Sequence, residues 1–148
     1  MKRAENYVTL EFLSRSSNES FARIAASGFA AQLDPTLDEL GDIKTAVSEA
    51  VTNAIVHAYP EKLGKVVMKM KILDNNELEI SVRDWGCGIE NIEQAREPLF
   101  TTGGGERSGM GFTIMESFMD RLYIKSVPGK GTMVTMRKRI AMRLNGKR

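Results

Sequence analysis

Three polar residues recur every four positions within the segment 36–59. Glu49, Asn53 and His57 therefore stack along one side of a helix, beside a stripe of alanines that follows the same period. A polar column next to a core-facing stripe is where a helix can line a cleft, although a solvated helix edge would show the same spacing. We expect His57, close to the helix end, to be satisfied by its neighbours and to have no chemical role.

An acidic residue and two glycines follow directly after an apolar segment that ends at Val82. Asp84 is followed by Gly86 and Gly88, and glycines this close together let the backbone approach a flat ligand. The carboxylate of Asp84 can accept a hydrogen bond from an exocyclic amine, which is how an adenine base would be read. An ordinary tight turn is the alternative interpretation.

A glycine-rich loop leads into a further apolar segment of helical spacing. Five of the nine residues 103–111 are glycine, and the free N–H groups at a helix start favour phosphate. Arg107 and Ser108 add a cation and a hydroxyl group. A flexible linker would explain the triple glycine but not the segment 108–111 at the helix entry. The sequence lacks GxxxxGK followed by Ser or Thr, which excludes a P-loop, and no strand precedes the loop as a Rossmann site requires.

These candidate residues must be positioned by a few strands. Alternating apolar residues predict strands at Val8, Leu10 and Phe12, at Val66, Met68, Met70 and Ile72, and at Leu78, Ile80 and Val82. The segments 122–127 and 132–140 are typical of a hairpin around residues 128–131. The run from Gly129 to Thr132 predicts a good turn and, by itself, nothing more.

Helical spacing predicts three helices. The first has Ser17 and Asn18 as capping candidates, stops at Asp34 and Pro35, and carries an apolar stripe at Phe21, Ile24, Ala25, Phe29 and Leu33. The second begins with a capping box formed by Thr36 and Glu39 and ends before Pro60. A short third helix covers Phe112 to Met119. Residues 84–111 are expected to be irregular.

The predicted order is β-α-α-β-β-loop-α-β-β. Hairpins outnumber βαβ units in it, which indicates an α+β fold: a two-layer sandwich with a mixed, mostly antiparallel sheet and helices on one face. A chain of 148 residues suffices for one domain, residues 1–148, with a core of its own.

Composition narrows the possible functions. A net charge of +2 gives no whole-domain signature of nucleic-acid binding. The single cysteine, Cys87, excludes an internal disulfide and fits a reducing compartment. No apolar run approaches the roughly 20 residues of a membrane span. We therefore expect a cytoplasmic protein that contacts neither nucleic acid nor membrane directly.

The motifs are far more specific in combination than singly. Their order along the chain resembles that of the ATP-binding Bergerat fold of gyrase, Hsp90, histidine kinases and MutL. The motifs are, in order, Glu49 to Asn53, Asp84 to Gly88, a glycine-rich loop ending at Gly111, and Gly129 to Thr132. Further segments resemble the branch of this fold that contains the anti-sigma serine kinases, namely 18–23, 31–36, 49–59, 98–102 and 106–116. The likeness therefore covers nearly the whole chain. It implies a homodimer that uses ATP to phosphorylate a serine of an anti-anti-sigma protein and that inhibits a sporulation sigma factor of the sigma-F type.

The resemblance also implies roles for individual residues. Asn53 would bind Mg²⁺, Glu49 would be the catalytic base, and Asp84 would bind the adenine amino group, with Gly86, Gly88 and Thr132 completing that pocket. Arg107 would lie near the γ-phosphate, and Arg23 on a surface shared by the sigma factor and the anti-anti-sigma protein. The remaining expected nucleotide contacts come from the loop: Thr101, Thr102, Gly105, Ser108, Gly109, Met110 and Gly111.

Other functions stay open at this stage. The chain is also compatible with a related anti-sigma serine kinase of a stress pathway, or with a nucleotide-gated binding module that lacks kinase activity. A histidine-kinase catalytic domain fits less well, because no phosphoacceptor helix precedes residue 49. The segment 103–105 is shorter and less charged than expected of relatives, and the basic segment 137–148 is expected to be a solvated strand end and tail.

Overall fold

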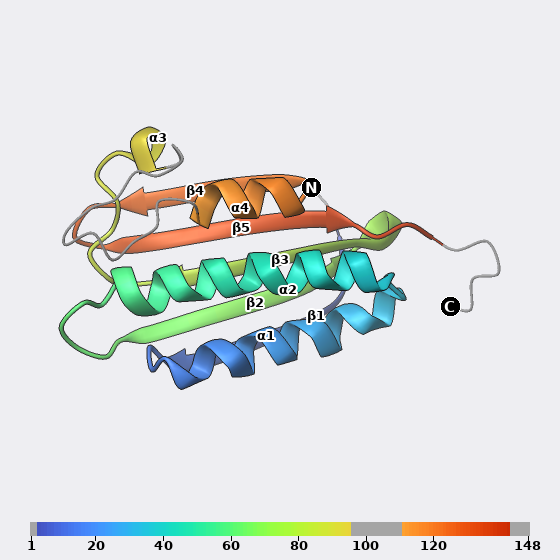
Figure 1. Ribbon diagram of the computed structural model, residues 1–148, viewed down its shortest axis with the longest axis horizontal. Coiled ribbons are helices and arrows are strands. Elements are labelled where there is room, and N and C mark those ends of the chain that lie inside the picture. Colours follow the sequence, from blue (N-terminus) through green and yellow to red (C-terminus); the bar gives the residue numbers. More distant parts are fainter. Residues whose placement is uncertain (1–2, 96–110, 143–148) are drawn as a thin grey trace.

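The computed structural model describes residues 3–95 and 111–142, and its core is a five-stranded sheet (Figure 1). The strands are β1 Ala4–Leu13, β2 Lys65–Leu73, β3 Glu77–Asp84, β4 Arg121–Val127 and β5 Gly131–Arg139. They lie in the order β1-β2-β3-β5-β4, and each neighbouring pair is antiparallel. The predicted mostly antiparallel sheet is thus confirmed, and the described strands are antiparallel throughout.

Helices cover one face of this sheet, as the two-layer prediction required (Figure 1). Helix α1 Ser17–Ala30 continues into the 3₁₀ turn η1 Ala31–Leu33, and α2 Leu37–Thr52 continues into the π-helical turn η2 Asn53–His57. Helix α4 spans Gly111–Phe118. Two short elements complete the described chain: the 3₁₀ turn η3 Asp74–Asn76 between β2 and β3, and the one-turn helix α3 Ile92–Ala95. No helix of these residues is long and apolar enough to cross a membrane.

The core follows the alternation seen in the sequence. Every second residue of β2 and β3 points to the helix layer, and the largest fully buried side chains include Met68, Met70, Leu78 and Ile80. The alternating residues of β1 are half-buried, since this strand forms an edge of the sheet. The predicted strands are therefore confirmed both in position and in the face that they bury.

Helix α1 is rotated relative to our prediction. Its buried residues are Ala22, Ala26 and Ala30, whereas Phe21 is 53% exposed and Ile24 65% exposed. The predicted stripe was wrong at Phe21 and Ile24, because it favoured the larger side chains, whereas Ala25, Phe29 and Leu33 do pack on the core. Small alanines bury more readily here, since they let α1 pack closely along α2 and the sheet.

The start of α1 also differs from the prediction. Ser16 is the N-cap, and its side chain makes no capping hydrogen bond. Ser17 is already the first helical residue, and the side-chain amide of Asn18 donates to the carbonyl oxygen of Leu13 at 2.9 Å. Asn18 thus ties the helix to the end of β1 instead of capping it.

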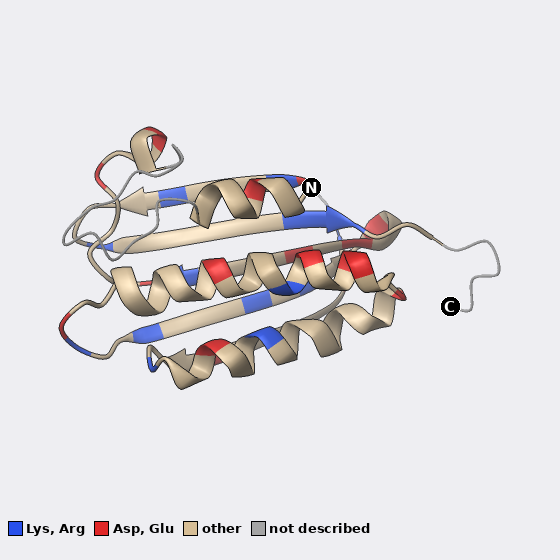
Figure 2. Cartoon of the chain, viewed as in Figure 1, with Lys and Arg blue, Asp and Glu red and all other residues tan. Residues whose placement is uncertain are grey.

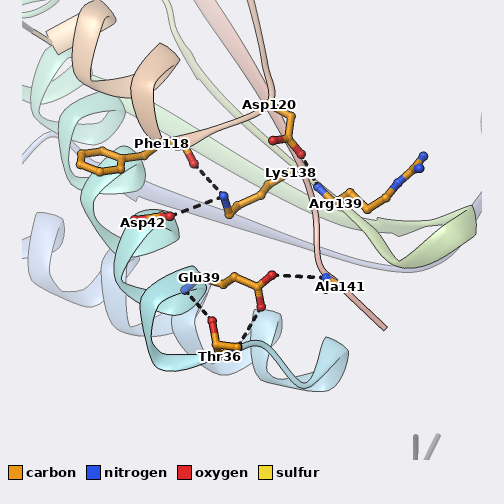
Figure 3. Close-up of polar contacts among 8 residues, drawn as sticks. All are labelled: Thr36, Glu39, Asp42, Phe118, Asp120, Lys138, Arg139 and Ala141. Carbon is orange, nitrogen blue, oxygen red and sulfur yellow. Dashed lines mark hydrogen bonds and ion pairs between the residues drawn. The ribbon is translucent and has the colours of Figure 1, made fainter. Parts of the chain in front are cut away.

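The start of α2 is fixed by the predicted capping box, which also holds the end of β5 (Figure 3). The backbone N–H of Glu39 donates to Thr36 Oγ1 at 3.0 Å, and the backbone N–H of Thr36 donates to Glu39 Oε1 at 2.8 Å. The other carboxylate oxygen of Glu39 accepts the backbone N–H of Ala141 at 3.3 Å. One side chain therefore connects α2 to the segment after the last strand.

A lysine next to this contact joins three elements (Figure 3). Phe118 is the last residue of α4, and its carbonyl oxygen accepts a hydrogen bond from Nζ of Lys138, on β5, at 3.0 Å. The same Nζ lies 3.5 Å from a carboxylate oxygen of Asp42 on α2. A cation is favoured at a helix C-terminus, because the free carbonyl groups there carry partial negative charge. Lys138 thus sets how α4 lies against α2.

Candidate active site

A cavity of about 520 Å³ opens between the end of α2, the π turn, the end of β3 and the start of β5. Its wall is mainly apolar, with a few polar groups that converge on it. The apolar part includes Ala50, Ala54, Val82, Phe112 and Val134, and the polar part includes Asn53, Asp84 and Thr132. An apolar pocket with a few placed polar groups is typical of a small-molecule site. The structure therefore brings together predicted residues that are far apart in the chain.

Asp84 is the buried acid of this cavity, with 6% of its surface exposed. Its Oδ1 accepts the backbone N–H groups of Gly86 at 2.9 Å and of Thr132 at 3.3 Å. Burial raises the pKa of Asp84 above its ordinary value, and these two hydrogen bonds act in the opposite direction. The carboxylate is thus held by the backbone in a cavity where it can accept a hydrogen bond from a ligand.

The glycines around Asp84 are required by close packing. A Cβ at Gly86 would collide with the carbonyl group of Ala58, to which the N–H of Cys87 donates at 3.1 Å. Gly88 has φ of +76°, and a Cβ there would meet the backbone of Val127. The DxGxG pattern is therefore more than a tight turn, because it binds the end of the π turn on one side and the β4–β5 hairpin on the other.

Ser126 is a residue that sequence reasoning missed. Its Oγ accepts the N–H of Ile89 at 2.8 Å and donates to the carbonyl oxygen of Gly131 at 3.1 Å. The hydroxyl oxygen of Thr132 lies 2.7 Å away. The signal was a serine on the core-facing side of β4, in line with the apolar Leu122 and Ile124. Ser126 locks Thr132 into the cavity wall.

Glu49 and Asn53 meet at the first residue of α4. A Cβ at Gly111 would lie 3.3 Å from Asn53 Nδ2 and 3.4 Å from Glu49 Oε1. The amide Nδ2 of Asn53 is buried and finds no hydrogen-bond partner among the described residues. Such an unsatisfied amide is expected where a ligand completes the site. The predicted polar column thus faces a cleft and is not a solvated helix edge.

The π-helical turn at residues 53–57 was not predicted. Asn53 accepts the backbone N–H of Ala58 at 3.1 Å, five residues on. Such widened turns occur frequently at functional sites. The turn places His57 in the cavity wall, and its carbonyl oxygen lies 3.3 Å from the Sγ of Cys87. Sequence spacing gave no indication of it, because an α-helical and a π-helical turn bury similar residues.

Glu49 lies beside a second acid from α1. Burial raises the pKa of Glu49, and the negative charge of Glu19 adds to this rise. A carboxyl group whose pKa is moved toward neutrality is better suited to accept a proton from a hydroxyl group. The position of Glu49 in the cleft, near Glu19, thus makes its carboxylate a stronger base.

Arg23 is held by an acid of its own helix. Its side chain is 39% exposed, and Nε lies 3.5 Å from Oε2 of Glu19, one turn earlier on α1. The same Glu19 oxygen accepts the hydroxyl of Ser48, which precedes Glu49. Through Glu19, Arg23 therefore lies at the boundary between α1 and α2. Its Nε is buried, although the side chain as a whole is partly exposed.

Several predicted site residues fall outside the described part of the chain. They are Thr101, Thr102, Gly105, Arg107, Ser108, Gly109 and Met110. Their roles therefore remain predictions, whereas Gly111 is placed at the cleft.

Comparison with known proteins identifies the family. Residues 14–138 match the histidine kinase-like ATPase domain. The anti-sigma F factor of Caldanaerobacter subterraneus subsp. tengcongensis is 58% identical over 136 residues, which cover 91% of this chain and 94% of that protein. The anti-sigma F factor of Clostridium acetobutylicum is 55% identical over 139 residues, or 93% of this chain and 96% of the relative.

Solved structures give the same fold. The RsbU and RsbW domains of a Mycobacterium tuberculosis protein match with a TM-score of 0.66 at 18% identity, over 91% of this chain and 32% of that longer chain. The resemblance seen in the sequence is thereby confirmed. The chain belongs to the histidine kinase-like ATPase family and, within it, to the anti-sigma F factors.

Proposed function

We propose that this chain is an ATP-dependent protein-serine kinase that also binds and inhibits a sporulation sigma factor of the sigma-F type. Its kinase substrate would be a serine of the cognate anti-anti-sigma protein. The observation that carries this proposal is the convergence of Glu49 and Asn53 on Gly111, beside the Asp84 cavity. The identity to anti-sigma F factors over almost their full length supports the choice of partners.

The cavity fits a nucleotide base. Asp84 would accept a hydrogen bond from the adenine amino group, and the apolar wall around Ala54 and Val134 would pack on the faces of the ring. Gly86, Gly88 and Thr132 hold Asp84 and the hairpin in place. We infer that ATP binds here with its phosphates toward the start of α4.

Asn53 is suited to hold Mg²⁺ together with the phosphates. An amide oxygen is a hard ligand, and Mg²⁺ commonly keeps several waters and needs few protein ligands. The oxygen Oδ1 of Asn53 would be the metal ligand, and the unpartnered Nδ2 of the same amide is a donor that fits a phosphate oxygen of the nucleotide. When bound, the metal would supply neutralisation of phosphate charge, on which phosphoryl transfer largely depends.

Glu49 would act on the substrate serine. It lies one helical turn from Asn53, and it can orient the hydroxyl group and accept its proton. Arg107 would offset charge that builds up on the transferred phosphoryl group. The loop residues Thr101, Thr102, Gly105, Ser108, Gly109 and Met110 would contact the nucleotide together with Gly111.

Arg23 would form part of a surface shared by both protein partners. Its planar guanidinium group can hold a carboxylate through two hydrogen bonds. Two partners that use one arginine cannot bind there together, which supplies a physical means of partner switching. We further propose a cytoplasmic homodimer formed by one domain of residues 1–148, without direct contacts to nucleic acid or membrane.

Two other functions are distinguishable from this one. A stress-pathway anti-sigma kinase would share the site but bind a different sigma factor. A nucleotide-gated binding module would bind Mg-ATP and the sigma factor yet transfer no phosphate.

A kinase assay with labelled ATP and the anti-anti-sigma protein tests the enzymatic part. We expect the substrate to gain phosphoserine. In Glu49→Ala the rate of phosphoryl transfer should fall about 10²-fold or more, with ATP binding retained. Asn53→Ala should lose metal-dependent ATP binding. Equal rates for Glu49→Ala and the unmodified protein would remove Glu49 from catalysis. An unchanged Mg-ATP affinity of Asn53→Ala, measured by calorimetry, would remove the metal assignment.

Sigma-factor affinity of Arg23→Glu in the presence of Mg-ATP tests the binding part. Reversing the charge should weaken both protein partners by about 2 kcal/mol or more if the contact is well desolvated. Nucleotide affinity should not change, and it reports on folding. Sigma-factor binding as tight as that of the unmodified protein would contradict the shared surface.

A further inference from the structure

The sheet has a second face, which no described helix covers (Figure 1). Cross-strand partners lie on the same face, so the register identifies its residues. One row across the sheet consists of Tyr7, Lys71, Glu79, Arg137 and Arg121. The face opposite the helices is therefore built from residues of all five strands.

This uncovered face is rich in positive charge. Strand β2 contributes Lys65, Lys69 and Lys71 to it, and β3 contributes Arg83. Strands β4 and β5 add Arg121, Lys125, Arg137 and Arg139. The acidic residues at ladder positions of the same face are Glu11, Glu77 and Glu79.

The helix layer has the opposite balance. Helix α2 carries Asp38, Glu39, Asp42 and Glu49 but a single lysine, Lys44 (Figure 2). A net charge of only +2 thus hides a strong separation of charge between the two faces. Such a field attracts partners of opposite sign to one face of the molecule.

Aromatic rings hold several of these cations in place. Lys65 Nζ lies 4.4 Å and Arg83 Cζ 4.7 Å from the ring centre of Trp85. Arg137 Cζ lies 5.8 Å from the ring centre of Tyr123. Contacts of this kind orient the cations and cover the ring faces, on which bases would otherwise stack.

A cavity of about 520 Å³ lies at one end of the face, where β4 begins and β5 ends. Three arginines line it, Arg121, Arg137 and Arg139, together with Asp120 and Glu77. Asp120 is fixed there because its Oδ2 accepts the backbone N–H of Arg139 at 2.7 Å. Arg137 is paired there with Glu79, whose Oε1 lies 2.8 Å from its Nε. Arg121 and Arg139 beside it suit a further carboxylate, which an arginine can hold through two parallel hydrogen bonds.

We propose that the uncovered sheet face docks an acidic polypeptide segment and that the arginine cavity holds one of its carboxylates. Charge complementarity selects an acidic partner. The acids set within the face favour a protein over a nucleic acid. A phosphate backbone carries charge along its whole length and would place some of it next to Glu77, Glu79 and Asp120, whereas a polypeptide can place uncharged residues there. This site lies on the other side of the sheet from the Asp84 cavity, so it is independent of ATP binding.

Fluorescence anisotropy with a labelled glutamate-rich peptide tests the proposal. We expect binding that weakens with added salt, and about tenfold weaker binding in the double variant Arg121→Glu, Arg139→Glu. The matched control is Lys62→Glu, which reverses an exposed charge outside the sheet and should bind the peptide as the unmodified protein does. Mg-ATP affinity, unchanged in all variants, reports on folding. Equal losses in the control and the double variant would overturn the proposal.

Two further measurements test the cavity and the class of partner. Arg121→Lys keeps the positive charge but removes the planar guanidinium group, so it should weaken peptide binding several-fold. Affinity equal to that of the unmodified protein would show that the cavity holds no carboxylate. Tighter binding of a polyuridine oligonucleotide or of phosphatidylserine vesicles than of the peptide, at the same salt concentration, would replace the acidic polypeptide by nucleic acid or membrane.

Discussion

Two carboxylates of the site differ in what surrounds them, although burial raises the pKa of both. Asp84 is held by the backbone N–H groups of Gly86 and Thr132, so its position is fixed by the turn and the hairpin. Glu49 instead lies near a second acid, Glu19, and across from Gly111. A fixed acceptor suits recognition of a base, whereas a carboxyl group made more basic suits proton transfer. The environments thus match the two proposed roles.

Asp84→Asn should separate recognition from stability. The asparagine oxygen can keep both backbone hydrogen bonds, but the amide then presents a donor where the adenine amine also donates. We expect ATP affinity to fall about a hundredfold, because a ligand donor and a protein donor are both left unsatisfied.

The stability of Asp84→Asn, in contrast to its ATP affinity, should not fall. Since the pKa of Asp84 is raised in the folded protein, its ionisation destabilises the fold as the pH rises above the ordinary pKa. Asparagine does not ionise, so the variant should be at least as stable at neutral pH by urea unfolding. A variant that unfolds more easily, with unchanged ATP affinity, would contradict the assignment.

Gly111→Ala should disturb the site without altering the core. The new Cβ would lie 3.3 Å from Asn53 Nδ2 and 3.4 Å from Glu49 Oε1, which is tight enough to displace both side chains. We expect at least a tenfold loss of kinase rate, since small displacements of catalytic groups cost about this much or more.

Gly28→Ala is the matched control for this variant. A Cβ at Gly28, on the exposed side of α1, meets nothing within 4 Å. This change should leave the rate unaltered and raise the free energy of unfolding by up to about 1 kcal/mol through helix propensity. A Gly111→Ala enzyme of normal rate would show that α4 does not confine Glu49 and Asn53.

At the scale of elements, strands were predicted better than helices. Alternation identified the buried side of β2 and β3 because each side chain points to one face or the other. The stripe of α1 was misjudged in its first turn only, because Phe21 and Ile24 are larger than Ala22, and size does not decide which side packs against α2. The π turn after Thr52 depends on the hydrogen bond from Ala58 to Asn53, which leaves no periodic signal.

Lys138→Met should loosen the packing of α4 against α2. The lysine side chain is only 13% exposed and joins Phe118 to Asp42, while methionine keeps a similar volume. We expect a loss of about 1–2 kcal/mol in the free energy of unfolding, measured in urea. Arg139→Met is the control, because only the backbone of Arg139 takes part in these contacts. Equal effects of the two changes would show that Lys138 adds nothing beyond surface charge.

Glu39 should make this corner of the fold sensitive to acid. Burial raises its pKa, but the hydrogen bonds from Thr36 and Ala141 and the charge of Lys138 outweigh burial, so the pKa is lowered. A lowered pKa contributes stability above the ordinary pKa, and this contribution is lost as the pH falls through the folded value. Glu39→Gln should therefore be less stable than the unmodified protein at pH 7, with the difference shrinking in acid. A difference independent of pH in urea unfolding would exclude the carboxylate as its source.

At the scale of the whole molecule, the sheet separates the Asp84 cavity from the basic face. The helix layer carries Arg23 and the cavity at Asp84, whereas the basic face lies opposite. The motifs singled out Asn53, Asp84 and Thr132, which line one cavity, because these residues are special in type and spacing. The basic face could not be predicted from a net charge of +2, since only the register shows which lysines and arginines share a side.

The outer edge of β1 provides the last prediction, a symmetric homodimer. Strand β1 pairs with β2 on one side only, and its exposed residues include Tyr7 at 66% and Leu13 at 50%. Unpaired backbone groups of an edge strand invite a second chain, and a two-fold dimer would cover both edges at once. Sedimentation at tens of micromolar should give twice the monomer mass of 16.5 kDa. At the same concentration, the amide protons of β1 that face away from β2 should exchange slowly with solvent, and on dilution they should exchange quickly. A 16.5 kDa species under these conditions would exclude the dimer. A dimer whose outward β1 amides exchange rapidly would show that the two chains meet through another surface.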